Sequence, residues 1–111
     1  MTKGFLMSQI TGKTLFISRH PGAVQWIKAQ PIVIDRFIAH LEIEEIQPGD
    51  RVIGSLPVHL AGQVCARGAE YYNLSIKLPE EFRGQELSCE QLKQMSARLE
   101  RFSVQIQPSQ F

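Results

Sequence analysis

The chain has 111 residues, about the size of one compact domain, so an enzyme with separate cofactor and substrate lobes is excluded. Hydrophobic residues make up 43% of the chain and charged residues 21%, and these ordinary globular values argue against disorder. The 12 Lys and Arg against 11 Asp and Glu leave a net charge of +1, too weak a field to bind duplex DNA or an anionic membrane. Any polyanionic ligand must therefore be held by a local site.

Cysteine usage and hydropathy bear on the cellular compartment. The two cysteines, Cys65 and Cys89, form no CxxC pair, so we expect free and mostly buried thiols rather than a zinc site or a disulfide framework. No apolar run approaches the ~20 residues that cross a bilayer, and residues 1–12 lack the apolar stretch of a signal peptide. We therefore expect a cytoplasmic protein without a membrane partner.

The first half of the chain alternates between strand and helix patterns. Residues 13–18 form a short apolar run typical of a strand, which the Pro-Gly pair that follows brings to an end. Residues 22–30 carry apolar side chains at helical spacing, and Pro31 stops that run. Residues 32–41 mix β-branched with polar residues, and we expect a second strand in at least their first half.

A third strand and a second helix follow directly. Residues 51–54 form a very short apolar run between turn residues, as a buried parallel strand would. Pro57 suits the first position of a helix, with its cap at Ser55 or Leu56, and Gly68 suits its end. The pattern therefore predicts a strand, a short loop and a helix.

The last third of the chain predicts one strand and one long helix. Residues 69–78 alternate between apolar and polar in their later part, which is typical of a strand. Ser88 and Gln91 match a capping box, and apolar residues then recur at helical spacing, so we expect a helix over 88–102. Residues 104–106 could add a small edge strand.

Strands that alternate with helices at such short spacing specify βαβ units. Their right-handed crossovers predict an α/β fold, a small Rossmann-like, mostly parallel sheet with helices on both faces. We expect a single domain over residues 13–107, between an N-terminal extension (1–12) and a C-terminal tail (108–111) that fray. Ligands of such folds bind beyond the carboxyl ends of the strands, which selects the loops at 18–22 and 54–59.

The first of these loops carries three chemically useful side chains in succession. Ser18, Arg19 and His20 follow a buried strand and precede a helix whose first amides lack intrahelical partners. Arginine can hold a phosphate at two points, while an imidazole can donate or accept a proton near neutral pH. A surface loop with an incidental histidine accounts for the same residues, so the pattern suggests a phosphate site without establishing one.

The second loop repeats this logic at the end of the third strand. Gly54 permits a close approach of the backbone, Ser55 supplies a hydroxyl, and the helix start after Pro57 supplies free amides. His59 falls in the first helical turn, where a plain surface residue and a ligand contact are equally good interpretations. Neither loop matches a P-loop or a GxGxxG fingerprint, which disfavours a triphosphate or dinucleotide cofactor.

Other polar and aromatic residues offer weaker signals. His40 follows an apolar strand pattern and is most simply interpreted as a partly buried structural histidine, with a catalytic role as the alternative. The three histidines show no HxH or HxxxH spacing, so we expect neither a metal nor any other cofactor. Tyr71 and Tyr72 could stack on bases, but neighbours in a strand point to opposite faces, so at most one can face a given ligand.

The sequence resembles the small accessory proteins of type III CRISPR systems that are regarded as ring nucleases. The similarity lies in four segments, taken in order: ISRHPGAVQWIKAQ, IAHL, IQPGDRVIGSLPVHLAGQVCARGAEYYNLS and FRGQELSCEQL. It extends from about Phe16 to Phe102, and SRHPGA and PGDRVIGSLPVHLA are its most specific blocks. The resemblance implies a Rossmann-like homodimer that binds cyclic tetraadenylate across its two-fold axis, cleaves it, and so switches off the signal for defence effectors.

The resemblance also assigns roles to residues in the matching blocks. It carries a ligand-binding role onto Ser18, Arg19, His20, Gly22, Ser55 and His59. Cleavage of RNA without a metal can use the substrate's own 2′-hydroxyl, so the protein need only align it, stabilise charge and assist proton transfer. We therefore expect a catalytic group of Ser18, Arg19 and His20, and a substrate-binding group of Gly22, Gly54, Ser55, Pro57, His59 and His40.

Two other functions fit the same sequence. A non-catalytic binder or sponge would sequester the cyclic nucleotide with the same loops, and no sequence feature separates binding from slow cleavage. A general α/β interaction module without a nucleotide ligand would be favoured if the two loops lay on opposite edges of the sheet.

Overall fold

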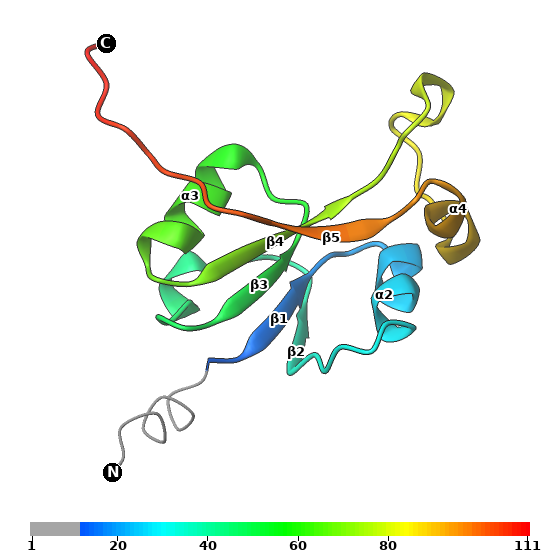
Figure 1. Cartoon of the computed structure of the whole chain (residues 1–111), viewed down its shortest axis with the longest axis horizontal. Coiled ribbons are helices and arrows are strands. Elements are labelled where there is room, and N and C mark those ends of the chain that lie inside the picture. The colour runs from blue at the N-terminus through cyan, green and yellow to red at the C-terminus, as the bar shows by residue number, and fades with distance from the viewer. Residues whose placement is uncertain (1–11) are drawn as a thin grey trace.

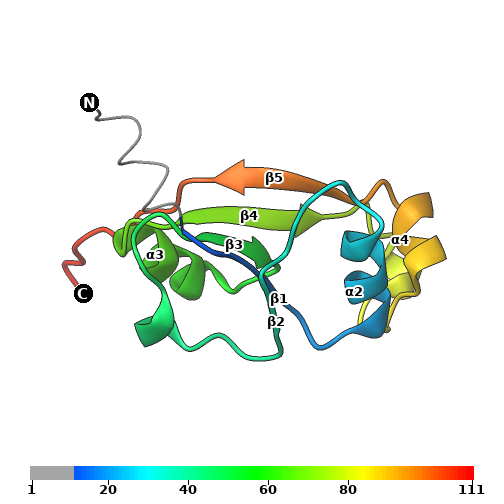
Figure 2. The same ribbon diagram turned by 90° about the horizontal axis from the view of Figure 1, so that it is seen from below.

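The computed structural model describes residues 12–111, so the expected N-terminal extension lies outside the described residues except for Gly12. Its centre is one five-stranded sheet in the order β2-β1-β3-β4-β5. The strands are β1 (Thr14–Ile17), β2 (Arg36–Ile38), β3 (Arg51–Gly54), β4 (Glu70–Ser75) and β5 (Arg98–Phe102). The first four pair in parallel and β5 is antiparallel to β4, as the opposed arrows of Figure 2 show. The predicted α/β fold with a mostly parallel sheet is confirmed.

Helices cover both faces of this sheet, as predicted. They are α2 (Pro21–Lys28), α3 (Val58–Ala66) and α4 (Cys89–Gln94), with short 3₁₀ turns η1 (Ile43–Glu45) and η2 (Glu80–Phe82) in the connections. Alternation along β1 sends Leu15 and Ile17 into the core under α3, and Phe16 into the core under α2 and α4. Figure 1 shows α3 on one side of the sheet and the other two helices across from it.

The second strand lies later in the chain than the sequence predicts. Residues 32–35 form no strand, and β2 has only three residues. Asp35 sets where pairing starts, because its amide donates to the Thr14 carbonyl at 2.8 Å and its carboxylate accepts from the Thr14 amide at 2.7 Å. Val33, an apparent strand residue, is 82% exposed in the loop before it. The β-branched residues at 32–34 therefore indicate a strand where the chain forms a loop.

The predicted long helix over 88–102 is wrong beyond its first two turns. The capping box is present, since the Ser88 hydroxyl accepts from the Gln91 amide at 3.1 Å and the Gln91 side chain accepts from the Ser88 amide at 2.9 Å. However, α4 ends at Gln94, and Ser96 then takes a left-handed conformation with φ of 58°. The chain reverses at this residue, which breaks the helix.

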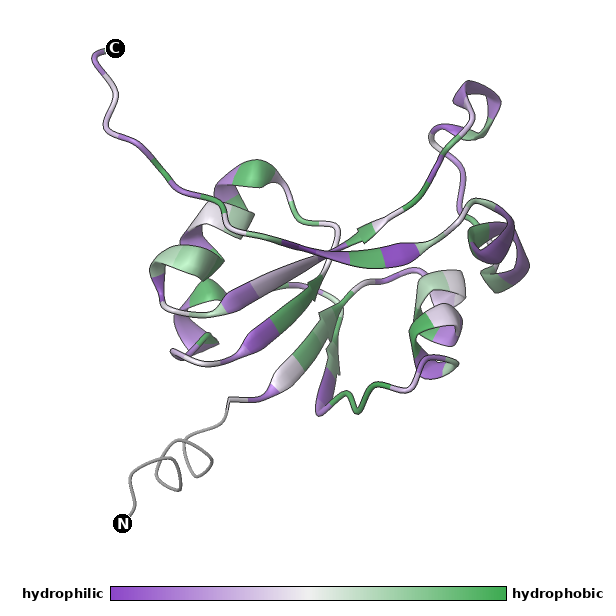
Figure 3. Ribbon diagram, in the orientation of Figure 1, coloured by the Kyte–Doolittle hydropathy of each residue, from purple (hydrophilic) through white to green (hydrophobic). Residues whose placement is uncertain are grey.

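The rest of that predicted helix is strand β5. Leu99 pairs with Leu74 across the antiparallel ladder, and Figure 3 shows hydrophobic colour between hydrophilic segments of β5. Its apolar residues Leu99 and Phe102 are three positions apart, a spacing that also suits a helix, which explains the error. The suggested edge strand at 104–106 is not formed: the Val104 amide instead donates to the Cys65 thiol at 3.4 Å, beside α3.

Cys65 and Cys89 are free, as predicted, but each is half-buried rather than buried. Residues 108–111 are exposed and belong to no helix or strand. Within residues 12–111, every helix is too short or too polar to span a bilayer.

Candidate functional site

A pocket of about 550 Å³ opens at the carboxyl edge of the sheet. It lies beyond β1 and β3, which are parallel neighbours with Ile17 opposite Gly54, so the loops that follow them start side by side. Because β2 and β3 flank β1, the connections diverge here to opposite sides of the sheet, and open α/β folds bind ligands at such a switch point. The two predicted loops share one edge, which removes the condition that favoured a general interaction module.

Most of the predicted site residues line this pocket: Ser18, Arg19, His20, His40, Gly54, Ser55 and Pro57. His40 joins the group from the loop that follows β2. Its side chain is exposed, so the expectation of a partly buried structural histidine is wrong. The chain thus brings all of these residues to the pocket from the ends of three adjacent parallel strands.

Two predicted residues lie outside the pocket lining. Gly22 is buried in the first turn of α2, where a Cβ atom would collide with the backbone carbonyl of Leu87. This glycine is therefore explained by the close approach of two chain segments rather than by contact with a ligand. His59 is exposed in the first turn of α3 and is not among the residues that line the pocket.

The loop after β1 is held from both sides. The Ser18 amide donates to the Ile38 carbonyl at 2.9 Å, and the Ser18 hydroxyl accepts from the His20 amide at 3.1 Å. His20 is the N-cap residue of α2, and no side chain caps that helix. The hydroxyl proton of Ser18 is not used in these bonds and can be donated to a ligand.

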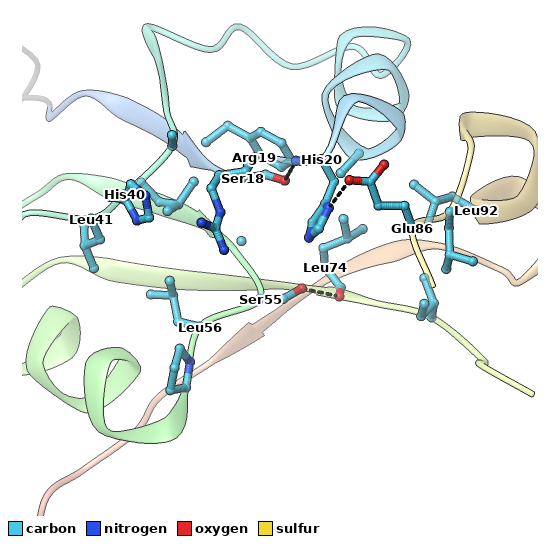
Figure 4. Close-up of a pocket in the computed structure, with 18 of the residues that line it drawn as sticks. Ser18, Arg19, His20, His40, Leu41, Ser55, Leu56, Leu74, Glu86 and Leu92 are labelled. Atoms are coloured by element: carbon cyan, nitrogen blue, oxygen red, sulfur yellow. Dashed lines mark hydrogen bonds and ion pairs between the residues drawn. The ribbon is translucent and has the colours of Figure 1, made fainter. Parts of the chain in front are cut away.

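Arg19 offers a cation to the pocket. Its side chain is exposed and has no ion pair or hydrogen bond within residues 12–111. Figure 4 shows its guanidinium reaching into the space between His20 and His40, across from Ser55. All of its N–H donors are thus free to bind an anion, and a planar guanidinium suits two-point binding of phosphate.

Sequence reasoning missed one acidic residue of the site. The Glu86 carboxylate, from the connection between β4 and α4, lies 3.6 Å from Nδ1 of His20 (Figure 4). Both side chains are exposed, at 58% for His20 and 71% for Glu86. A signal was present, because Glu86 stands within FRGQELSCEQL, one of the segments that carry the resemblance.

The loop after β3 is held by hydrogen bonds to the Tyr71 side chain. The Tyr71 hydroxyl accepts from the Leu56 amide at 2.9 Å and donates to the side-chain oxygen of Asn73 at 2.6 Å. Burial raises the pKa of Tyr71, so this phenol stays neutral and keeps its proton for donation. Pro57 is the N-cap of α3 rather than its first residue, and the Ser55 hydroxyl donates to the Leu74 carbonyl at 3.2 Å instead of capping the helix.

Replacing Tyr71 by phenylalanine is expected to lower the free energy of unfolding by about 1–3 kcal/mol, because the Leu56 amide loses its buried acceptor. Urea denaturation measures the change. Tyr72→Phe is the matched control, since its hydroxyl donates to Glu70 at 2.7 Å from a more exposed position and should matter less. Equal losses in the two variants would contradict a special role for the Tyr71 hydroxyl.

The walls of the pocket are mainly aliphatic. Leu41, Leu56, Leu60, Leu74 and Leu92 line it, and its one Phe, Tyr or Trp ring within the described residues, Phe16, is only 1% exposed. Tyr72 lines a different cavity, and neither tyrosine reaches this pocket. The suggested tyrosine platform for bases is therefore not at this site.

Residues 12–111 contain no group of three or more His, Cys, Asp or Glu side chains that could hold a metal ion. The polar side chains that line the pocket are a guanidinium, two imidazoles, two hydroxyls, one carboxylate and the Gln85 amide.

Comparison with known proteins places the chain in a family. No curated protein and no solved structure matches it. A family model described as "Putative CRISPR-associated protein (Cas_VVA1548)" matches residues 15–105. This span includes both pocket loops and Glu86, and it confirms the resemblance to CRISPR-associated accessory proteins at the level of the family. The chain belongs to the Cas_VVA1548 family of CRISPR-associated proteins.

Proposed function

We propose that this protein is a ring nuclease, which binds a cyclic oligoadenylate messenger and cleaves it to linear products, thereby ending type III CRISPR signalling. One observation carries the proposal: the Arg19 guanidinium, which has no partner within residues 12–111, and the His20 imidazole lie together with a helix start that has no side-chain cap, at the switch point of the sheet. This is a local anion site in a nearly neutral protein, as a ring of phosphates requires. Membership of a CRISPR-associated family supports a defence role.

The reaction needs no water and no metal. The 2′-oxygen of one nucleotide attacks the adjacent phosphorus, so that an O2′–P bond forms while the P–O5′ bond breaks. The 2′-hydroxyl loses its proton and the leaving 5′-oxygen gains one, which yields a 2′,3′-cyclic phosphate and a 5′-hydroxyl. His20 moves protons in this scheme, Arg19 neutralises charge on the phosphate oxygens, and the Ser18 hydroxyl donates a further hydrogen bond.

We also propose that the working unit is a homodimer. A pocket of about 550 Å³ suits a ligand of drug-like size, whereas cyclic tetraadenylate has four nucleotides, so one protomer can hold only part of the ring. Two protomers related by a two-fold axis would present two copies of the pocket to a ligand with internal symmetry. Light scattering tests this, and a monomeric mass that saturating cyclic tetraadenylate leaves unchanged would exclude the dimer.

The proposed activity is tested by incubating the protein with cyclic tri-, tetra- and hexaadenylate in the presence of EDTA, with products separated by chromatography. We expect the tetraadenylate ring to be opened fastest and EDTA to have no effect. If all three rings stay intact although the tetraadenylate binds tightly, the protein is a sponge for the messenger rather than an enzyme. If none of them binds, the nucleotide ligand itself is wrong.

A further inference from the structure

We infer that Glu86 is a positioning residue that orients the His20 imidazole for proton transfer, an inference that rests on the proposed function. Within the described residues, Glu86 is the one acidic side chain that lines the pocket. A carboxylate beside a phosphate ligand is unfavourable unless a cation or an N–H donor engages it. Nδ1 of His20, at 3.6 Å, is that group.

The fold holds Glu86 in this place through the residues that follow it in the chain. The next residue, Leu87, is half-buried in the core under α2 and α4, and its carbonyl fills the space that a Cβ of Gly22 would need. Immediately after it, the capping box of Ser88 and Gln91 fixes the start of α4. The segment before α4 is therefore packed against the first turn of α2, directly beside His20, the N-cap of that helix.

The geometry assigns a tautomer to His20. A carboxylate near Nδ1 favours the neutral form that carries its proton on Nδ1, and this leaves the lone pair on Nε2, the nitrogen on the far side of the ring. That nitrogen can accept the 2′-hydroxyl proton, after which the carboxylate stabilises the imidazolium. A separation of 3.6 Å is longer than a hydrogen bond, and such contacts commonly tighten when substrate binds.

Stability does not explain the pair. Both side chains are more than half exposed, and an exposed ion pair contributes little to the free energy of unfolding. Removing the Glu86 carboxylate should therefore leave the melting temperature almost unchanged. An effect on catalysis that is much larger than the effect on stability would separate a positioning role from a structural one.

The first test measures the tautomer itself. Nitrogen-15 NMR of the histidine side chains, recorded well above the ordinary imidazole pKa of about 6.5, reports which nitrogen carries the proton. We expect the His20 signals, assigned by their loss in His20→Ala, to show the Nδ1–H form in the native protein and to shift toward Nε2–H in Glu86→Ala. Glu81→Ala, which removes an exposed carboxylate outside the pocket lining, should leave them unchanged. Identical His20 signals in all three proteins would overturn the inference.

The second test is a double-mutant cycle with cyclic tetraadenylate under single-turnover conditions. Glu86→Ala should slow cleavage by about 10- to 100-fold, a part of the 10²- to 10⁴-fold that proton transfer supplies, without weakening binding. In the His20→Ala background it should cause no further loss. Equal slowing in both backgrounds would show that Glu86 does not act through His20. If the native protein opens no ring, the proposed function fails, whereas the tautomer measurement still decides whether Glu86 orients His20.

Discussion

Replacing His20 by alanine is expected to slow single-turnover cleavage of cyclic tetraadenylate by about two to four orders of magnitude, with affinity kept within a few fold. The imidazole lies at the pocket mouth, on the first residue before α2, and Glu86 lies on its Nδ1 side. A group that mainly moves protons contributes to the transition state much more than to ground-state binding. Rapid-quench measurements of the rate, with a separate titration for affinity, check both parts.

One result would contradict the proton-transfer role of His20. Should His20→Ala cleave at a near-native rate while Ser18→Ala or His59→Ala loses activity, the proton-transfer residue has been assigned to the wrong side chain. The proposed reaction would survive that result. His40→Ala adds a further comparison, because an exposed pocket residue should affect binding without lowering the melting temperature.

Replacing Arg19 by alanine is expected to weaken both binding and cleavage. The guanidinium has no protein partner within residues 12–111, so its donors are free for phosphate in the ground state and in the transition state alike. A charge-assisted hydrogen bond contributes about 1.5–3 kcal/mol, which corresponds to a loss of affinity of about 10- to 100-fold. The loss in kcat/KM should be larger, because charge on the phosphate oxygens grows in the transition state.

Two variants control for charge and geometry at Arg19. Arg83→Ala removes the same charge from an exposed residue outside the pocket lining and should bind normally. Arg19→Lys keeps the charge but not the planar fork, so it should fall between the native protein and Arg19→Ala. Equal loss of affinity in Arg19→Ala and Arg83→Ala would mean that overall charge, rather than a local contact, attracts the ligand.

The sequence is sufficient to predict where the candidate pocket lies. Short apolar runs separated by a helix pattern specify parallel strands, and parallel strands place the residues after Ile17 and after Gly54 at one edge. The rules for strand connections therefore predict that Ser18, Arg19, His20 and Ser55 lie close together. In the structure these four residues line one pocket. These rules act through backbone pairing, so they need no knowledge of side-chain contacts.

Contacts between segments that lie far apart in the sequence cannot be predicted from these rules. Glu86 reaches His20 only because Gly22 lets the chain before α4 approach α2, and no local pattern contains that approach. For His59 the local pattern also left two interpretations open, and the fold places this residue in the first turn of α3, outside the pocket lining. The start of β5 could not be predicted either. The apolar residues on both sides of Ser96 keep a helical spacing, although a turn at Ser96 separates α4 from β5.

The most direct test of the central claim is to count the rings that each protomer opens. Cyclic tetraadenylate is supplied in large molar excess over the protein, with EDTA, and the products are identified by mass spectrometry. The ring nuclease account predicts that many rings are consumed per protomer and that the linear products end in a 2′,3′-cyclic phosphate and a 5′-hydroxyl. If the excess cyclic tetraadenylate stays intact after all binding sites are filled, the account is contradicted.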